Sequence, residues 1–230
     1  MKTGFINAYC HKPVKKYYSY HGEIRDCLIE PDPGTFENFP ADVPYGPTQY
    51  MLFTHIYISG YYHGDQSYLV AHNAATGTFT LTRVGQAYDP GRDLYWDYRT
   101  GIAFDTIALP DNSKIVSGKM SLQVYRNDGW VPFDIIMRNG MPTFPHIYEY
   151  PGDYNIGAYW GNGGSCRFRE IQEIYFNEVG VGWINKEGIT KFQLISSRDL
   201  GAVPPTGLEV VTYKRTGANH RLEVGYKLPL

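Results

Sequence analysis

Histidine and aspartate residues in the first half of the chain have the side-chain chemistry of metal ligands. His63, Asp65 and His72 lie in one short stretch. Histidine nitrogens and carboxylate oxygens are common ligands of transition metals, and structural zinc sites space them in recognisable patterns. These three residues follow no such pattern, and isolated histidines on β segments are more often solvated or hydrogen-bonded. We therefore predict no metal site.

Asp89, Asp93 and Asp97 form a second candidate set, in the segment YDPGRDLYWDYR. Their spacing of four residues differs from the alternating oxygen ligands of an EF-hand loop. The simpler interpretation is a set of polar turn residues. Carboxylates and carbonyls from separate turns can also hold a structural calcium ion, and that alternative stays open.

Catalysis requires a nucleophile, a base or a pair of carboxylates in convergent positions. The sequence contains no GxSxG, HExxH, P-loop or GxGxxG motif. Glu170, Glu173 and Glu178 lie in one region, but a solvated rim explains them better than a catalytic pair. We therefore predict a protein that is not an enzyme and has no cofactor.

Aromatic residues gather in the segment RNGMPTFPHIYEYPGDYNIGAYWGNGGS, residues 138–165. Proline and glycine punctuate this segment, which predicts a long loop inserted between strands. Sugars stack their C–H faces on aromatic rings, and protein interfaces use Tyr and Trp as anchors. The alternative is that the rings pack on one another and stiffen the loop. The residues expected to contact a glycan or a protein partner are Tyr148, Tyr150, Tyr154, Tyr159 and Trp160.

The first 50 residues are predicted to be an extended N-terminal arm. A basic, tyrosine-rich piece precedes EPDPGTFENFPADVPYGP, where proline recurs every few residues. Proline cannot donate a ladder hydrogen bond, so this piece is not expected to form a central strand. The alternative is a loop folded back over its own domain. The arm residues expected to make assembly contacts are Lys12, Lys15, Lys16, Tyr17, Tyr18 and Tyr20.

The composition is that of a folded domain without an obvious charged partner. The 230 residues are 43% hydrophobic and 19% charged, so the chain can bury a core. A net charge of −2 gives no basis for binding nucleic acid. No apolar run is long enough for a signal peptide or a membrane span. Cys10, Cys27 and Cys166 are expected to be reduced thiols, with a Cys10–Cys27 disulfide as the alternative.

Residues 51–230 alternate between apolar and polar side chains in short segments separated by Gly- or Pro-containing turns. A period of two is typical of half-buried strands, and this spacing of strands indicates a sandwich or barrel. We predict an all-β fold, a jelly-roll-like antiparallel β-sandwich. The residues expected on the buried faces are Phe79, Leu81, Ile102, Phe104, Met120, Leu122, Val124, Phe192, Leu194, Leu208, Val210, Leu222, Val224 and Tyr226.

Polar residues mark the ends of several elements. Asp105 and Asp199 each close a strand and are expected to accept hydrogen bonds from turn backbone N–H groups. Arg198 could form a local ion pair with Asp199. A short helix is expected from the N-cap Asn177 to Gly188, although the glycines inside it weaken helical propensity.

The segment YRTGIAFDTIALPDNSKIVSGKMSLQVY resembles the DNRLRE, or disaggregatase-related, family of β-sandwich domains. VGWINKEGITKFQLISSRDLGAVPPTGLEVVTY is similar to the downstream signature of that family, and RLEVGY to its closing strand. The likeness covers roughly residues 65–226. It implies an extracellular surface module of the kind attached to carbohydrate-active or cell-wall proteins. The residues that carry the first likeness are Phe104, Asp105, Leu109, Pro110, Ile115 and Leu122 to Tyr125.

Together these features favour a non-enzymatic structural protein on the surface of a phage or other virus, as a capsid decoration or a tail-associated protein. It would be attached through the arm to other virion subunits, present the β domain outward and form a homo-oligomer. A particle assembled in the host cytoplasm needs no export signal. The alternative is a carbohydrate-binding module or adhesin on a cell or virion surface, with glycans as ligands.

Overall fold

The computed structural model describes residues 44–129, 131–167, 172–215 and 219–230. The six arm residues expected to make assembly contacts, together with Cys10, Cys27 and Glu170, lie outside these described ranges, so the expectations about them stay predictions. Among the described residues, no helix combines the length and apolarity needed to cross a membrane.

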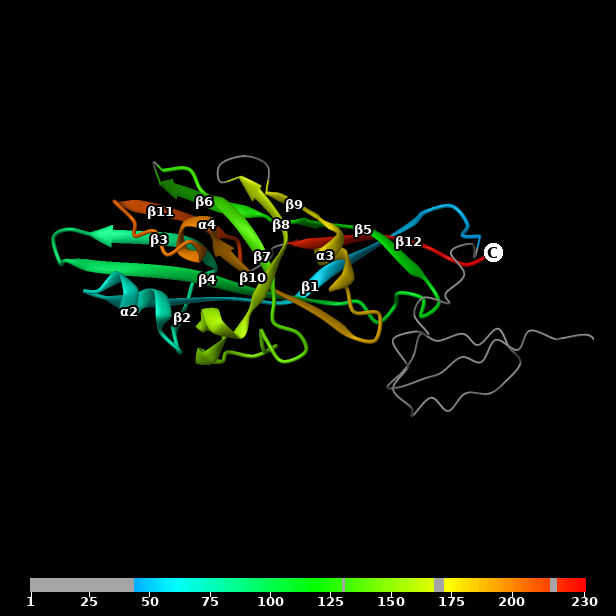
Figure 1. Cartoon of the computed structure of the whole chain (residues 1–230), viewed down its shortest axis with the longest axis horizontal. Helices are drawn as coiled ribbons and strands as arrows, with labels where there is room; N and C mark the ends of the chain where they lie inside the picture. Colours follow the sequence, from blue (N-terminus) through cyan, green and yellow to red (C-terminus); the bar gives the residue numbers. More distant parts are fainter. Residues whose placement is uncertain (1–43, 130, 168–171, 216–218) are drawn as a thin grey trace, which may run out of the picture.

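Strands dominate the described chain, which confirms the all-β prediction (Figure 1). The helices are short: α2 (Tyr68–Asn73), η1 (Pro151–Tyr154), η2 (Ile156–Ala158), α3 (Glu178–Gly182) and α4 (Ser197–Leu200). The strands are β1 (Gln49–Asp65), β2 (Thr78–Thr80), β3 (Arg83–Asp89), β4 (Leu94–Asp105), β5 (Lys114–Ser121), β6 (Val124–Gly129), β7 (Asp134–Asn139), β8 (Trp160–Arg167), β9 (Glu173–Phe176), β10 (Ile189–Ser196), β11 (Leu208–Tyr213) and β12 (Arg221–Lys227).

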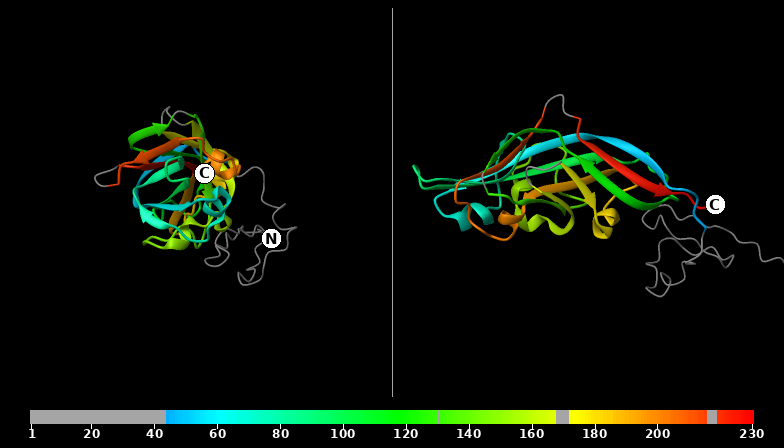
Figure 2. Two further views of the ribbon diagram at one scale, coloured as in Figure 1. Left: turned by 90° about the vertical axis from the view of Figure 1, so that its left-hand side faces the viewer. Right: turned by 90° about the horizontal axis from the view of Figure 1, so that it is seen from above.

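The strands pair antiparallel, and eight of them close a barrel. The ring runs β1–β12–β5–β9–β8–β7–β10–β4, and β4 pairs back with β1. The left view of Figure 2 looks along the long axis of this body. The jelly-roll sandwich is not confirmed, because a closed ring of strands takes the place of two separate sheets.

Two long strands give the molecule its elongated shape (Figures 1 and 2). β4 pairs with β10 over its second half and with β3 over its first half, so the sheet branches there. The branch continues from β3 to β11 and β6. β1 likewise pairs with β12 near its start and with β2 further along. Beyond the barrel, β1 and β4 therefore support a second region made with β2, β3, β11 and β6.

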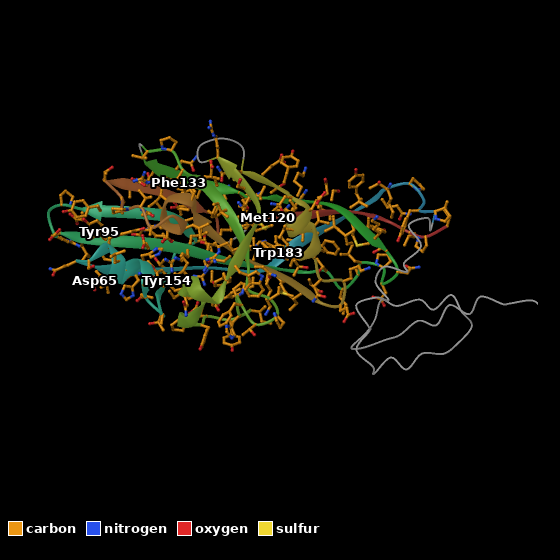
Figure 3. All side chains as sticks on the ribbon, viewed as in Figure 1. Asp65, Tyr95, Met120, Phe133, Tyr154 and Trp183 are labelled. Atoms are coloured by element: carbon orange, nitrogen blue, oxygen red, sulfur yellow. The ribbon has the colours of Figure 1, made fainter. Side chains whose placement is uncertain are left out.

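The hydrophobic core fills the barrel, as the alternation in the sequence predicts. The Phe176 and Phe192 rings meet edge to face at a centroid distance of 5.3 Å. Met120 and Trp183 lie in this middle part of the molecule, whereas Tyr95 and Asp65 lie toward the end opposite the C-terminus (Figure 3). Predicted core residues that are buried include Ile102, Phe104, Met120, Leu122, Phe192, Leu194, Val210, Leu222, Val224 and Tyr226.

The prediction of burial is wrong for two residues. Leu81 follows β2 and Leu208 opens β11, and both side chains are about half exposed, 51% and 44%. Leu81 lies just outside β2 and Leu208 is the first residue of β11, so neither occupies the interior of a strand. The predicted helix does begin after Asn177, whose side chain accepts a hydrogen bond from Gly180 N at 2.9 Å. It ends at Gly182, earlier than expected.

A buried histidine next to the barrel makes stability depend on pH. The Gln123 N–H donates to His220 Nδ1 at 3.0 Å, so the ring proton is on Nε2, which donates to Lys214 O at 2.8 Å. Burial lowers the pKa of His220 to about 4, and the neighbouring His55 ring contributes in the same direction. The folded protein therefore prefers neutral His220, and stability from this group is present above pH 6.5 and lost as the pH falls toward 4.

We expect unfolding between pH 4 and 6.5 to be coupled to proton uptake by His220. Urea unfolding of the parent and of His220→Gln, measured from pH 7 to pH 4, checks this expectation. The free energy of unfolding of the parent is expected to fall more steeply than that of the variant, because glutamine does not titrate. Parallel curves for the two proteins would contradict it.

Candidate functional site

Three aromatic side chains and an arginine surround a hollow on the sheet where β1, β2, β3 and β4 meet. Its volume is about 210 Å³, and its lining residues are Tyr62, Thr80, Arg83, Trp96 and Tyr98. The Tyr62 ring centroid lies 5.3 Å from that of Trp96 and 6.1 Å from that of Tyr98. The guanidinium carbon of Arg83 lies 5.5 Å from the Tyr98 centroid. The hollow thus combines apolar ring faces with a positive charge.

Strand register and one glycine position the rings of this hollow. Tyr62 stands opposite Tyr98, and Gly64 stands opposite Trp96. A Cβ atom at Gly64 would lie 2.7 Å from a carbon of the Trp96 ring, so the indole lies directly on the glycine backbone. Because side chains alternate along a strand, Asp97, between Trp96 and Tyr98, points to the buried face. The arrangement therefore depends on rigid strands.

The loop between β7 and β8 and the first residue of β8 present a second group of rings. Tyr148, Tyr150 and Trp160 have exposed fractions of 57%, 41% and 50%. The His146 ring lies 4.2 Å from the Tyr150 ring and 5.0 Å from the Tyr148 ring, measured between centroids. Three of the five residues predicted to contact a ligand are therefore accessible, and two of them cluster around a histidine.

The buried carboxylate of Asp153 holds this loop in place through hydrogen bonds. Its carboxylate accepts hydrogen bonds from the His146 backbone N–H at 3.0 and 3.1 Å, and it contacts His146 Nδ1 at 2.8 Å. The Tyr61 hydroxyl lies 3.5 Å from the same carboxylate and accepts from Tyr150 N at 3.0 Å. Burial raises the pKa of Asp153, while the His146 contacts act in the opposite direction. The loop segment that carries Tyr148 and Tyr150 is thus held next to β1 through Tyr61 and Asp153.

Tyr154 and Tyr159 are buried, so the structure places them where a ligand at the surface cannot reach their rings. The Tyr154 hydroxyl donates to Ala71 O at 2.8 Å, and the Tyr159 hydroxyl donates to Asp153 O at 3.2 Å. The Arg138 guanidinium also donates to Tyr159 O. These two tyrosines hold the shape of the loop, which corresponds to the stiffening alternative.

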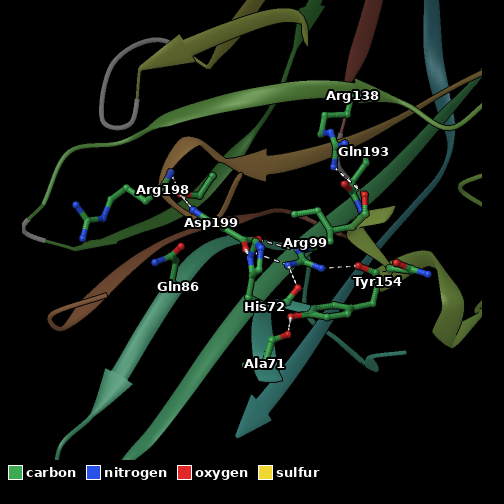
Figure 4. A network of polar contacts seen from close by, with 12 residues as sticks. Ala71, His72, Gln86, Arg99, Arg138, Tyr154, Gln193, Arg198 and Asp199 are labelled. Atoms are coloured by element: carbon green, nitrogen blue, oxygen red, sulfur yellow. Dashed lines mark hydrogen bonds and ion pairs between the residues drawn. The ribbon is translucent and has the colours of Figure 1, made fainter. Parts of the chain in front are cut away.

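A buried ionic network joins the loop to the sheet and the helices (Figure 4). Arg99 donates to both carboxylate oxygens of Asp199, at 2.8 and 2.9 Å. It also donates to Tyr154 O at 2.8 Å and to His72 O at 2.7 Å, and its guanidinium carbon lies 4.2 Å from the Tyr154 ring centroid. His72 Nδ1 lies 2.7 Å from Asp199 Oδ1. Arg99 and Asp199 are fully buried.

The two aspartates in this region have opposite pKa directions. Burial would raise the pKa of Asp199, but the Arg99 charge and the hydrogen bonds from His72 and Arg99 hold it below its ordinary value. Burial raises the pKa of Asp97 well above its ordinary value, the charge of Asp199 adds to that shift, and Arg99 opposes it. The negative charge of Asp199 is therefore balanced by Arg99 and His72. Asp97 has no such balance, so its charged form is disfavoured.

The structure separates His63, Asp65 and His72, the first candidate set considered for a metal. His63 Nδ1 lies 3.0 Å from Thr76 O, and Asp65 accepts from Ser67 N at 2.8 Å, while His72 belongs to the buried network. The His63 and Asp65 contacts are hydrogen bonds to nearby backbone, whereas His72 contacts Asp199, which is distant in the sequence.

The second set is also divided. Asp89 accepts from Gly91 N at 3.0 Å, and Asp93 accepts from the Tyr88 hydroxyl at 3.0 Å, both at the turn between β3 and β4. Asp97 points to the buried side of β4. Asp89 and Asp93 are therefore turn residues, and Asp97 belongs to a different environment.

Other predicted polar contacts have mixed outcomes. Asp105 accepts from Ile107 N at 3.2 Å, which confirms its turn role. The predicted local pair between Arg198 and Asp199 is wrong, because Arg198 Nε lies 2.8 Å from Glu209 Oε2 and Asp199 pairs with Arg99. The physical reason is that α4 turns the two neighbouring side chains in different directions.

The two described acidic residues considered for catalysis, Glu173 and Glu178, lie in separate elements. Glu173 on β9 lies 3.6 Å from Lys119 Nζ, and Glu178 begins α3. The residues of the hollow, in contrast, were not anticipated. The alternation in LYWDYR, which puts Trp96 and Tyr98 on one face, is the signal that could have pointed to them.

No family model matches this chain, and no curated protein shows a significant match to it. The resemblance to the DNRLRE family therefore rests on the sequence motifs alone.

Proposed function

We propose that this protein is a non-catalytic carbohydrate-binding domain that binds through the hollow of Tyr62, Thr80, Arg83, Trp96 and Tyr98. The observation that carries the proposal is the position of the Tyr62 ring, whose centroid lies 5.3 Å from that of Trp96 and 6.1 Å from that of Tyr98, with the Arg83 guanidinium beside the Tyr98 ring. Aromatic rings accept the C–H face of a sugar, and a few polar groups then fix its orientation. Arg83 and Thr80 supply hydrogen-bond donors for sugar hydroxyl or carboxylate groups.

The exposed loop rings extend the proposal to a second contact surface. Tyr148, Tyr150 and Trp160 offer ring area that costs little conformational entropy on binding, because each side chain has few rotatable bonds. The contacts of Asp153 with His146, beside the Tyr148 and Tyr150 rings, keep this part of the loop in place before a ligand arrives. Preorganisation of this kind increases affinity.

Trp96→Ala is expected to weaken binding to a glycan by roughly 30-fold, about 2 kcal/mol, because it removes a central ring of the hollow. A glycan array with the parent protein identifies the ligand, and titration calorimetry measures the loss. Trp160→Ala in the same assay tests the loop surface. Tyr125→Ala is the matched control, since Tyr125 lies on β6 and is 71% exposed. Absence of binding by the parent, or equal loss in the control, contradicts the proposal.

A structural role on a virion is the second candidate. The early part of β1 points the apolar side chains of Tyr50, Leu52 and Ile56 outward, each at least half exposed, close to where the predicted arm joins the domain. Such a strip suits contact with other virion subunits or with copies of the same chain. The resemblance to surface modules supports a virion or, alternatively, a cell-surface location.

Assembly through the arm predicts protection from proteolysis. Limited proteolysis is expected to cut the predicted arm, residues 1–50, rapidly in the isolated protein and slowly in the assembled particle, because contact with a neighbour shields the backbone. Mass spectrometry of the fragments measures the two rates. Equal rates in both states would remove this candidate.

A further inference from the structure

A polar layer is buried beneath the sheet that carries the aromatic hollow. Asp97 on β4 stands opposite Gln86 on β3, and Gln86 stands opposite Glu209 on β11. All three side chains are fully buried. Tyr68 and His72 of α2, together with Asp199 of α4, contribute further buried polar groups. Such a layer costs free energy unless each group has a partner.

Several oxygens of this layer have no hydrogen-bond partner among the described residues. They are both carboxylate oxygens of Asp97, Oε1 of Gln86 and the hydroxyl of Tyr68. Three of these four atoms can only accept, unless the Asp97 carboxyl is protonated. A group of buried acceptors without donors calls for a cation or for donors from outside the chain.

The positions of neighbouring ligand atoms match a cation site. One atom each from His72, Asp97 and Asp199 lies within 4.8 Å of the others, and no other such group of three occurs among the described residues. The contact of 2.7 Å between His72 Nδ1 and Asp199 orients the imidazole. The three residues come from α2, β4 and α4, so folding brings them together.

We propose that His72, Asp97 and Asp199 form a binding site for one divalent transition-metal ion, with Zn²⁺ as the expected occupant. Imidazole nitrogen together with carboxylate oxygen suits Zn²⁺ better than Ca²⁺ or Mg²⁺, which prefer oxygen alone. Gln86 Oε1 and the Tyr68 hydroxyl, which have no hydrogen-bond partner among the described residues, are the candidates for further oxygen contacts. The ion compensates the Asp97 charge, as Arg99 does for Asp199. Its role is structural, because the site lies inside the domain.

The test uses refolding, because a buried site fills most readily while the chain folds. The full chain is unfolded in urea with a chelator, then refolded without metal or with Zn²⁺, Mn²⁺ or Ca²⁺ in separate samples. We expect one Zn²⁺ per chain by mass spectrometry of the metal, and a rise in Tm of roughly 5–10 °C at a hundredfold excess over Kd. Mn²⁺ and Ca²⁺ are expected to give smaller rises.

Asp97→Asn is the decisive variant, because it replaces an anionic ligand, whose oxygens make no hydrogen bond among the described residues, by a neutral amide that binds Zn²⁺ far more weakly. It is expected to fold, to retain no Zn²⁺ and to show no metal-dependent rise in Tm. Asp65→Asn is the matched control, since Asp65 accepts from Ser67 N in the adjoining turn, and it should bind like the parent. The proposal is overturned if the parent binds no Zn²⁺, if Asp97→Asn binds it equally well, or if Ca²⁺ stabilises the parent more than Zn²⁺.

Discussion

Arg99→Met is expected to lower the free energy of unfolding by about 3–5 kcal/mol, the usual cost of removing one partner of a buried ion pair. Methionine approximates the volume of the arginine stem, so the loss reflects charge and hydrogen bonds more than packing. The variant leaves Asp199 buried without its cation and leaves the carbonyl oxygens of Tyr154 and His72 without their donors. Urea unfolding at pH 7 measures the change.

The control for this prediction is an arginine in a surface pair. Arg92 Nε lies 3.7 Å from Asp89, and the Arg92 side chain is 74% exposed. Arg92→Met is expected to change the free energy of unfolding by less than about 0.5 kcal/mol, because water and salt screen exposed pairs. A similar loss of stability in Arg99→Met and Arg92→Met would contradict the prediction, because it would show that burial in the network does not set the cost of removing an arginine.

A double variant tests whether the unpaired charge of Asp199 causes the loss of stability in Arg99→Met. Arg99→Met with Asp199→Asn removes both charges, so it is expected to be more stable than Arg99→Met alone by about 1–2 kcal/mol. A further loss from the second substitution would contradict the view that the uncompensated Asp199 carboxylate is the main cause of the damage.

The sequence predicts the strands because alternation is a local property. Met120 and Leu122, or Leu222 and Val224, show by their spacing which face is buried, and the structure confirms both pairs. Closure of the barrel, in contrast, is not a local property of the sequence. It depends on partners such as Gln49 and Tyr226, which lie at opposite ends of the domain sequence. No period along the chain records which strands become neighbours.

The candidate site shows the same limit. Tyr148, Tyr150 and Trp160 were recognised from composition, but composition cannot distinguish them from Tyr154 and Tyr159, which are buried. Turn residues mark where a loop runs, whereas its contacts with distant strands decide which rings it exposes. The hollow itself requires four strands to be adjacent, so no single segment reveals it.

Glycines in short helices illustrate how tertiary contacts reverse a local expectation. Gly180 weakens a helix by propensity alone, yet a Cβ atom there would lie 2.0 Å from Gly163 O on β8. The Gly163 carbonyl also accepts from Asn177 N at 2.9 Å, which fixes α3 against the strand. A Cβ at Gly163 would in turn lie 2.3 Å from the Trp183 ring. The absence of side chains is therefore what lets α3 and Trp183 pack on the barrel.

Gly180→Ala is expected to lower the free energy of unfolding by about 3 kcal/mol, at the upper end of the usual cost of overpacking. The clash is with backbone, so no side-chain rotation relieves it, and moving α3 away would break the Asn177 hydrogen bond to Gly163. Gly182→Ala is the matched control in the same helix, because a Cβ there meets no atom within 4 Å. It is expected to be neutral or to stabilise by about 0.5 kcal/mol. Urea unfolding with tryptophan fluorescence compares the two variants, and equal effects would mean that helix propensity, not the contact with β8, governs this position.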